Sequence, residues 1–224
     1  MCRMFGAAAV GLLAVAVAQA HFPFVVPDAG GSSAKVVFSD DLNPDPNVNV
    51  EKIASTKLTL RDAAGKESPL ETKKGDGCYL VNLPGGGPRV VYGTTEFGVS
   101  QKGADKPFLL VYYPKALLGS VPEKVATTGA KLEVVPAGGP GQARFRVLSE
   151  GKPAADVEVT VLPPGSAKKA VKTDKEGLTP AFDGSGRYGV FARLTEAKGG
   201  EHAGKKYEEV RHYATLVADL GPSR

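Results

Sequence analysis

The chain has 224 residues, 23 % of them charged and a formal net charge of +4, a balance that excludes wholesale disorder or a collagen-like fibre. Glycine (28) and proline (17) together make up about a fifth of it, which is too many turn-forming residues for a helical bundle. The basic residues are scattered, without a basic block or an interleaved aromatic patch. We therefore expect no nucleic-acid partner.

Residues 1–20 are expected to form a signal peptide. Arg3 supplies a positive start, Phe5–Val17 is an uncharged apolar run, and Ala18-Gln19-Ala20 has the small-x-small pattern of a cleavage site. The run is shorter than the roughly 20 residues of a membrane-spanning helix, and no later stretch is long enough. The predicted mature protein starts at His21, has no membrane span and is located in the periplasm or secreted.

Cleavage would remove Cys2 and leave Cys78 alone, so no internal disulfide is expected. Neither a basic residue nor a histidine stands next to Cys78 to lower its pKa. We interpret it as a buried, inert thiol.

Alternating apolar and polar residues predict short strands in the first half of the mature chain, separated by Gly, Pro, Asn and Asp. One helical turn is expected at Pro114–Ser120, followed by a linker at Val121–Gly129. The predicted strands are Ala34–Ser39, Ser55–Leu60, Cys78–Leu83, Arg89–Tyr92 and Pro107–Tyr113.

The second half shows the same pattern with clearer alternation. Turns are predicted at Glu150–Pro153 and Thr173–Gly177. The predicted strands are Lys131–Pro136, Ala143–Leu148, Val157–Val161, Arg187–Leu194 and Tyr207–Leu220. With no helix long enough for a βαβ crossover, the prediction is an all-β protein of two antiparallel β-sandwich domains, Ig-like or transthyretin-like, at 21–128 and 129–224.

Three phrases carry a family resemblance: Phe145–Val159, Thr173-Asp174-x-x-Gly177 and Gly186-Arg-Tyr188-Gly-Val190. They resemble carboxypeptidase-regulatory or transthyretin-like domains. Together with Leu132–Pro136 and the opening His21-x-x-Phe24-Val-Val-Pro27, the mature chain resembles a secreted bacterial family of two β-domains associated with nickel and cobalt uptake systems. The resemblance implies nickel or cobalt as ligand and a membrane metal-uptake system as partner. Imidazole and amine ligands also suit copper, so the expected ligand is a transition-metal ion (Cu, Ni or Co).

His21 is the main candidate metal ligand. As the first residue of a processed chain it offers a free α-amine and an imidazole, two nitrogens that lose protons near neutrality. Together they can close a chelate ring through the amine and Nδ1, and the affinity would rise with pH because binding releases protons. A histidine at that position can also be accidental, since a signal peptidase tolerates many residues there.

His212 and His202 are the candidate partners of His21. Period-2 alternation places His212 on the apolar face of the last strand, with Val210, Ala214 and Leu216. A neutral core histidine explains that position equally well. His202 stands in a polar loop beside Glu201, where exposure to solvent is the alternative to ligation.

Residues 39–47 (SDDLNPDPN) gather the oxygen ligands of Asp40, Asp41, Asn43, Asp45 and Asn47. The glycine and bidentate glutamate of a calcium loop are absent and two prolines intervene, so a solvated loop with Asx turns is the preferred interpretation over a calcium site.

The sequence predicts a secreted or periplasmic transition-metal-binding accessory protein and no enzyme. The alternatives are a structural or interaction module of the cell envelope without metal, and a copper oxygenase. The oxygenase lacks support because the chain has no tryptophan to form the flat aromatic platform expected of a polysaccharide oxidase. Other enzyme classes lack support because no nucleophile elbow or zinc-protease motif occurs.

Overall fold

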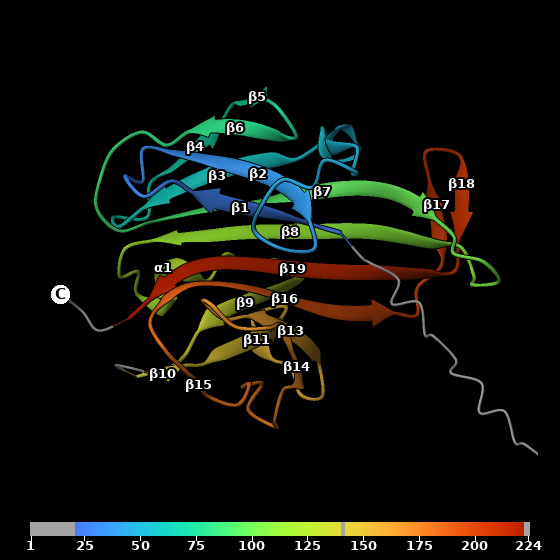
Figure 1. The fold of residues 1–224 in the computed structure, drawn as a ribbon. Helices are drawn as coiled ribbons and strands as arrows, with labels where there is room; N and C mark the ends of the chain where they lie inside the picture. The colour runs from blue at the N-terminus through green and yellow to red at the C-terminus, as the bar shows by residue number, and fades with distance from the viewer. Residues whose placement is uncertain (1–20, 140–141, 222–224) are drawn as a thin grey trace, which may run out of the picture.

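The computed structural model describes residues 21–139 and 142–221. It is all-β, with 55 % strand and 4 % helix, and consists of several mostly antiparallel sheets in a sandwich-like arrangement (Figure 1). The predicted fold class is confirmed at this level. No helix of the described segments is long and apolar enough to cross a membrane.

Eight strands and two short helices come from the first half of the chain. Glycines with positive φ, such as Gly31 and Gly77, occupy tight turns between them. The elements are β1 (Phe22–Pro27), β2 (Ser33–Ser39), the 3₁₀ helix η1 (Val50–Ile53), β3 (Lys57–Asp62), β4 (Glu67–Leu70), β5 (Thr72–Lys74), β6 (Cys78–Asn82), β7 (Arg89–Ser100), β8 (Phe108–Leu118) and α1 (Glu123–Ala126).

The second half contributes only strands. The predicted Thr173–Gly177 turn is present between two of them, where the Asp174 carboxylate accepts from the amides of Glu176 and Leu178. The strands are β9 (Leu132–Pro136), β10 (Gln142–Ala143), β11 (Phe145–Ser149), β12 (Lys152–Pro153), β13 (Glu158–Leu162), β14 (Lys169–Lys172), β15 (Phe182–Asp183), β16 (Gly186–Glu196), β17 (Gly200–His202), β18 (Lys205–Tyr207) and β19 (Glu209–Leu220).

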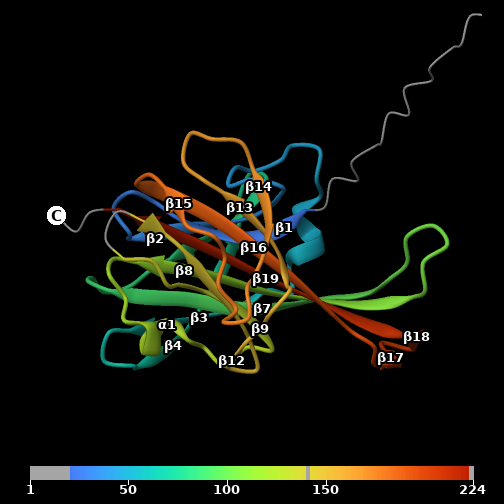
Figure 2. The same cartoon turned by 90° about the horizontal axis from the view of Figure 1, so that it is seen from below.

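One eight-stranded sheet runs through both halves of the chain, in the order β14-β13-β16-β19-β8-β7-β3-β4. Its neighbours are antiparallel except at the centre, where β19 pairs in parallel with β8, from Glu209 beside Phe108 to Ala218 beside Leu117. The first four strands in this order come from residues after 129 and the last four from residues before 128. The parallel pair is therefore the junction of the two halves (Figures 1 and 2).

Each face of this sheet is covered by a smaller sheet. The four strands β1-β2-β6-β5 pack on one face and enclose a core that includes Phe24, Val36 and Val91. The three strands β12-β11-β9 pack on the other face and enclose a core that includes Phe145 and Val190. Successive residues of the central strand β19 enter different cores, because strand side chains alternate between faces.

A buried ion pair joins the end of the first half to the start of the second. The Lys115 ammonium on β8 donates to the Glu133 carboxylate on β9 at 2.9 Å and to the Ala126 carbonyl at 3.0 Å. Glu133 also accepts from the amides of Thr128 and Gly129. Both charged side chains are almost completely buried, so the connection around residue 128 is held by charged contacts inside the protein.

The structure corrects one predicted element. Pro114–Ser120 makes no helical turn, because β8 continues to Leu118 between two hydrogen-bonded neighbours. Leu117 and Leu118 point into the two different cores. Burial on both faces outweighs the helix propensity of the Ala-Leu-Leu run. The predicted linker also contains the short helix α1.

Candidate functional site

His21 lies directly before β1, at the edge of the four-stranded sheet. β1 is antiparallel to β2 from Phe22 beside Ser39 onwards, and its side chains pack on the central strands, where the Phe22 and Tyr213 rings lie 5.2 Å apart. The Tyr112 hydroxyl donates to the His21 carbonyl at 3.5 Å. The His21 ring lies 5.9 Å from the Phe38 ring, so both backbone and side chain are positioned by the first core.

The His21 ring contacts a carboxylate of the acidic loop. Its Nε2 is 3.1 Å from Oδ2 of Asp45, and the two side chains are 20 % and 22 % exposed. Asp45 Oδ1 accepts from the Asn47 amide at 2.9 Å. The Asn47 amide and the His21 ring hold the pKa of the Asp45 carboxyl below its ordinary value, so the carboxylate is ionised at neutral pH.

An ionised carboxylate only accepts hydrogen bonds, so Nε2 of His21 carries the proton in this contact. In the neutral ring Nδ1 then keeps its lone pair. Nδ1 is also the ring nitrogen that lies close enough to the α-nitrogen of the same residue to chelate a metal with it. Carboxylate–histidine contacts of this kind orient metal-ligating imidazoles and increase their basicity.

Asp45 was not connected with His21 from the sequence, although it was recognised in the acidic loop. The two residues are 24 positions apart, and no periodicity of a single strand relates them. The expected Asx turns are present at Asp41 and Asp45, whose carboxylates accept from the amides two residues ahead. The only indication of this contact in the sequence is the carboxylate-rich segment itself, whose Asx turns hold Asp45 in an ordered position.

His212 lies on β19 and faces the second core, as its alternation predicts. Its Nδ1 is 3.0 Å from the Tyr113 hydroxyl and its Nε2 is 3.2 Å from the Glu196 carboxylate. Burial first, and then nearby carboxylates, raise the pKa of Tyr113 to about 12, so this hydroxyl keeps its proton and donates it to Nδ1. Both ring nitrogens of His212 are thus occupied by protein groups.

The structure does not bring His212 and His21 together. Tyr213 points to the face of the eight-stranded sheet that β1 covers, and its neighbour His212 points to the opposite face. A shared centre of these two imidazoles, as expected from the sequence, is not formed. The physical reason is the path of β1, which crosses over the first core.

His202 lies in the β17–β18 hairpin, opposite Lys205. This hairpin stands at the end of the central sheet, beyond β7 (Figure 1). In the described part of the chain no hydrogen bond or ion pair joins His202 to either of the other histidines. Within residues 21–139 and 142–221, no group of three or more His, Cys, Asp or Glu side chains is arranged to hold a metal ion.

Cys78 is buried at the start of β6, and burial raises the pKa of its thiol. It lies in the first core, where the effect of burial outweighs the opposing charge of Lys35. These features agree with the interpretation of an inert thiol.

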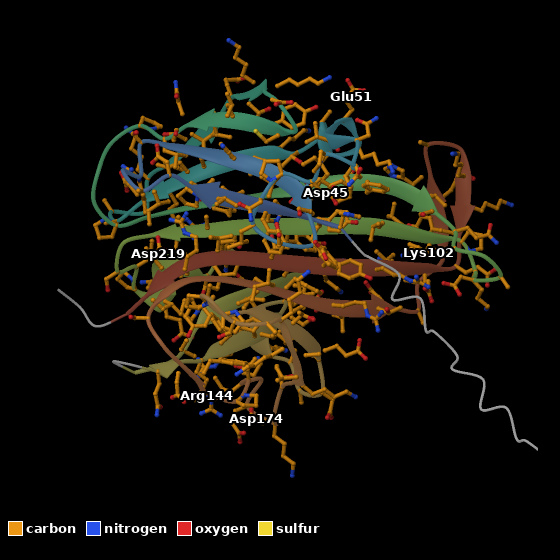
Figure 3. The ribbon with its side chains drawn as sticks, in the orientation of Figure 1. Asp45, Glu51, Lys102, Arg144, Asp174 and Asp219 are labelled. Atoms are coloured by element: carbon orange, nitrogen blue, oxygen red, sulfur yellow. The ribbon has the colours of Figure 1, made fainter. Side chains whose placement is uncertain are left out.

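The chain matches no protein-family model and no curated protein. The resemblance of its motifs to a metal-uptake-associated family thus stays a prediction. The contact between His21 and Asp45 is the geometry in this part of the molecule that suits a metal ligand; Asp45 is labelled in Figure 3.

Proposed function

We propose that the protein is a secreted or periplasmic accessory protein that binds a transition-metal ion through His21 after removal of residues 1–20. The observation that supports this function best is the 3.1 Å contact between His21 Nε2 and the Asp45 carboxylate. It leaves Nδ1 as the acceptor nitrogen of the ring. Nitrogen ligands of this kind suit Cu(II), Ni(II) and Co(II), with Cu(II) favoured by the usual affinity order.

In this proposal the α-amine and Nδ1 of His21 are the metal ligands, and Asp45 is a positioning residue that holds the ring. The Asp45–Asn47 turn fixes the carboxylate before a metal arrives, which reduces the ordering cost of binding. His212 and His202 are no longer included among the ligands. The other coordination positions of the metal would be filled by water or by residues of a membrane metal-uptake system.

The finer fold assignment is also a proposal. We infer that residues 129–224 form a transthyretin-like sandwich. The Thr173–Gly177 turn and the deeply buried Tyr188 of the Gly186–Val190 phrase support it. An experimental structure of this segment, compared with known transthyretin-like domains, would test the assignment.

The test of the metal site needs protein that starts at His21. Cu(II) and Ni(II) are titrated into this protein and into one with a single glycine placed before His21. We expect the extra residue to weaken binding strongly, because it converts the amine into an amide. His21→Ala should do the same, whereas His202→Ala is the control and should leave affinity unchanged.

Asp45→Asn tests the positioning role separately. We expect it to lower the metal affinity by about 10- to 100-fold, the usual range when a metal-ligating histidine loses its hydrogen-bonded carboxylate. Unchanged affinity on adding the glycine would overturn the proposal and favour the alternative, a structural or interaction module without metal. Intact mass of the exported protein decides whether His21 is its first residue.

A further inference from the structure

A cavity of about 390 Å³ lies at the other end of β1 from His21. The turn between β1 and β2, the glycine-rich loop before β7, the end of β8 and Asp219 of β19 line it. The six residues of β1 span the roughly 20 Å between His21 and the cavity. Asp219 and Asp45, labelled in Figure 3, lie well apart. The cavity is therefore independent of the proposed metal site.

The feature that points to a ligand is Arg89, the first residue of β7. Its side chain lines the cavity but is only 4 % exposed. The guanidinium donates to the carbonyls of Gly31 and Pro84. Among the described residues its Nε is sealed from solvent without an acceptor, and no carboxylate pairs with the guanidinium. The Nη groups, which reach the carbonyls of the lining, are therefore the part of the guanidinium that a ligand in the cavity could contact. A buried cation without an anionic partner is costly.

Two glycines of the cavity lining lie next to this guanidinium. Gly31 and Gly85 have φ values of +67° and +80°, which favour glycine. A Cβ atom at Gly31 would lie 3.5 Å from Nη2 of Arg89, and one at Gly85 would lie 3.7 Å from Nη1. A Cβ atom at either position would make only an ordinary van der Waals contact with the guanidinium, so it is the backbone conformation that favours glycine there.

The carboxylates of the lining are already engaged elsewhere. Asp219 forms two hydrogen bonds of 2.9 and 2.8 Å with Arg187. Asp28 accepts from the Ser32 amide and the Ser33 hydroxyl, and the Ser33 contact is the main cause that lowers its pKa. Both carboxylates repel anions of higher charge. They leave Arg89 as the group in the lining that attracts a single negative charge.

We propose that this cavity binds a small organic monocarboxylate, whose carboxylate accepts from the guanidinium of Arg89. A planar guanidinium matches a carboxylate through paired, charge-assisted hydrogen bonds. The volume is in the range of pockets for small ligands. The site would give the protein a second ligand, of the opposite charge to the proposed metal ion.

The experiment is a titration followed by NMR of the folded, full-length mature protein. Acetate, butyrate and benzoate are the probes, with inorganic phosphate and sodium chloride as separate arms. We expect saturable shifts of the Arg89 Nε–H resonance and of the Gly85–Gly87 amides with carboxylates. Chloride at equal ionic strength should produce no saturable shift.

Two variants localise the binding. Arg89→Lys keeps the charge but loses the planar fork, so carboxylate affinity should fall by about tenfold or more. Arg193→Gln removes an exposed arginine of β16 that pairs with Glu158 on the neighbouring strand β13, outside the cavity lining, and should leave affinity unchanged. If Arg89→Lys fails to fold, the presence or absence of a saturable shift of the Arg89 Nε–H resonance in the wild-type protein still tests the proposal.

Three outcomes would overturn the proposal. The first is the absence of any saturable change at Arg89 with all three carboxylates. The second is an equal response to chloride, which would indicate a nonspecific salt effect. The third is tighter binding of phosphate than of any carboxylate, since the two aspartates of the lining should exclude it.

Discussion

Burial lowers the pKa of His212 below its ordinary value, and the nearby Lys131 and Lys198 act in the same direction. The Glu196 carboxylate opposes this shift without reversing it. The unfolded chain therefore binds a proton at His212 more readily than the folded protein does. Stability from this residue is complete above pH 6.5 or so and is lost as the pH falls toward the lowered pKa.

We accordingly expect the free energy of unfolding to decrease as the pH falls from 7 to 5, with a slope of at most about 1.4 kcal/mol per pH unit from this one residue. His212→Gln should make the slope smaller, because glutamine does not titrate. Urea unfolding at several pH values measures it. His202→Gln, in the β17–β18 hairpin, is the matched control and should keep the wild-type slope. Identical slopes for His212→Gln and wild type would contradict the prediction.

For individual residues, the sequence predicts the face of a strand on which a side chain lies. It does not predict which residues that side chain contacts. Alternation correctly placed His212 on the apolar face of its strand. Its partners Tyr113 and Glu196 are 99 and 16 positions away and could not be identified without the register of three strands. The same limit applied to His21, because only the folded acidic loop brings Asp45 to its ring.

Among the elements, the connection from β8 to β9 depends on the buried Lys115–Glu133 pair. Burial disfavours ionisation of Glu133, but the Lys115 charge and the Thr128 hydrogen bonds outweigh it and lower the pKa of this carboxyl. Removing one partner of such a pair leaves an uncompensated charge inside the protein.

We expect Glu133→Gln to lower the free energy of unfolding by about 3–5 kcal/mol. The double variant Lys115→Met/Glu133→Leu should recover most of that loss, because it removes both charges and keeps apolar volume. Chemical denaturation of Lys115→Met, of Glu133→Leu and of the double variant gives the coupling. Glu158→Gln, at the exposed pair with Arg193, is the control and should change stability little. A loss in the double variant equal to the sum of the losses in the two single variants would show that the two charges do not depend on each other.

Strand positions were largely predictable from period-2 alternation, because each strand has a face in a core. The Pro114–Ser120 segment was not, since its Ala-Leu-Leu run is apolar on both faces and lacks alternation. Only its neighbours β7 and β19 show that it is a central strand buried on both sides.

For the whole molecule, the parallel β8–β19 pair joins the two halves into one sheet. The register of residues 209–218 against 108–117 is a contact between distant parts of the chain. Sequence patterns therefore predicted two sandwiches but not the sheet they share.

Because both halves contribute strands to this sheet, we expect them to unfold cooperatively. Phe145→Ala in the second core should cost about 3–5 kcal/mol and lower the hydrogen-exchange protection of slowly exchanging amides in β2 by the same free energy as in β11. The change is read by native-state hydrogen exchange with NMR. Unchanged protection in β2 would show that the halves unfold independently.

Among the described strands, the central strand β19 comes last in chain order, so it is synthesised after both of its neighbours β8 and β16. Until residues 209–220 are available, β8 and β16 each lack a neighbour and present an open row of backbone donors and acceptors. The nascent polypeptide thus cannot complete its main sheet before residues 209–220 have been synthesised. Products that stop before this strand would be prone to pair with one another through those edges.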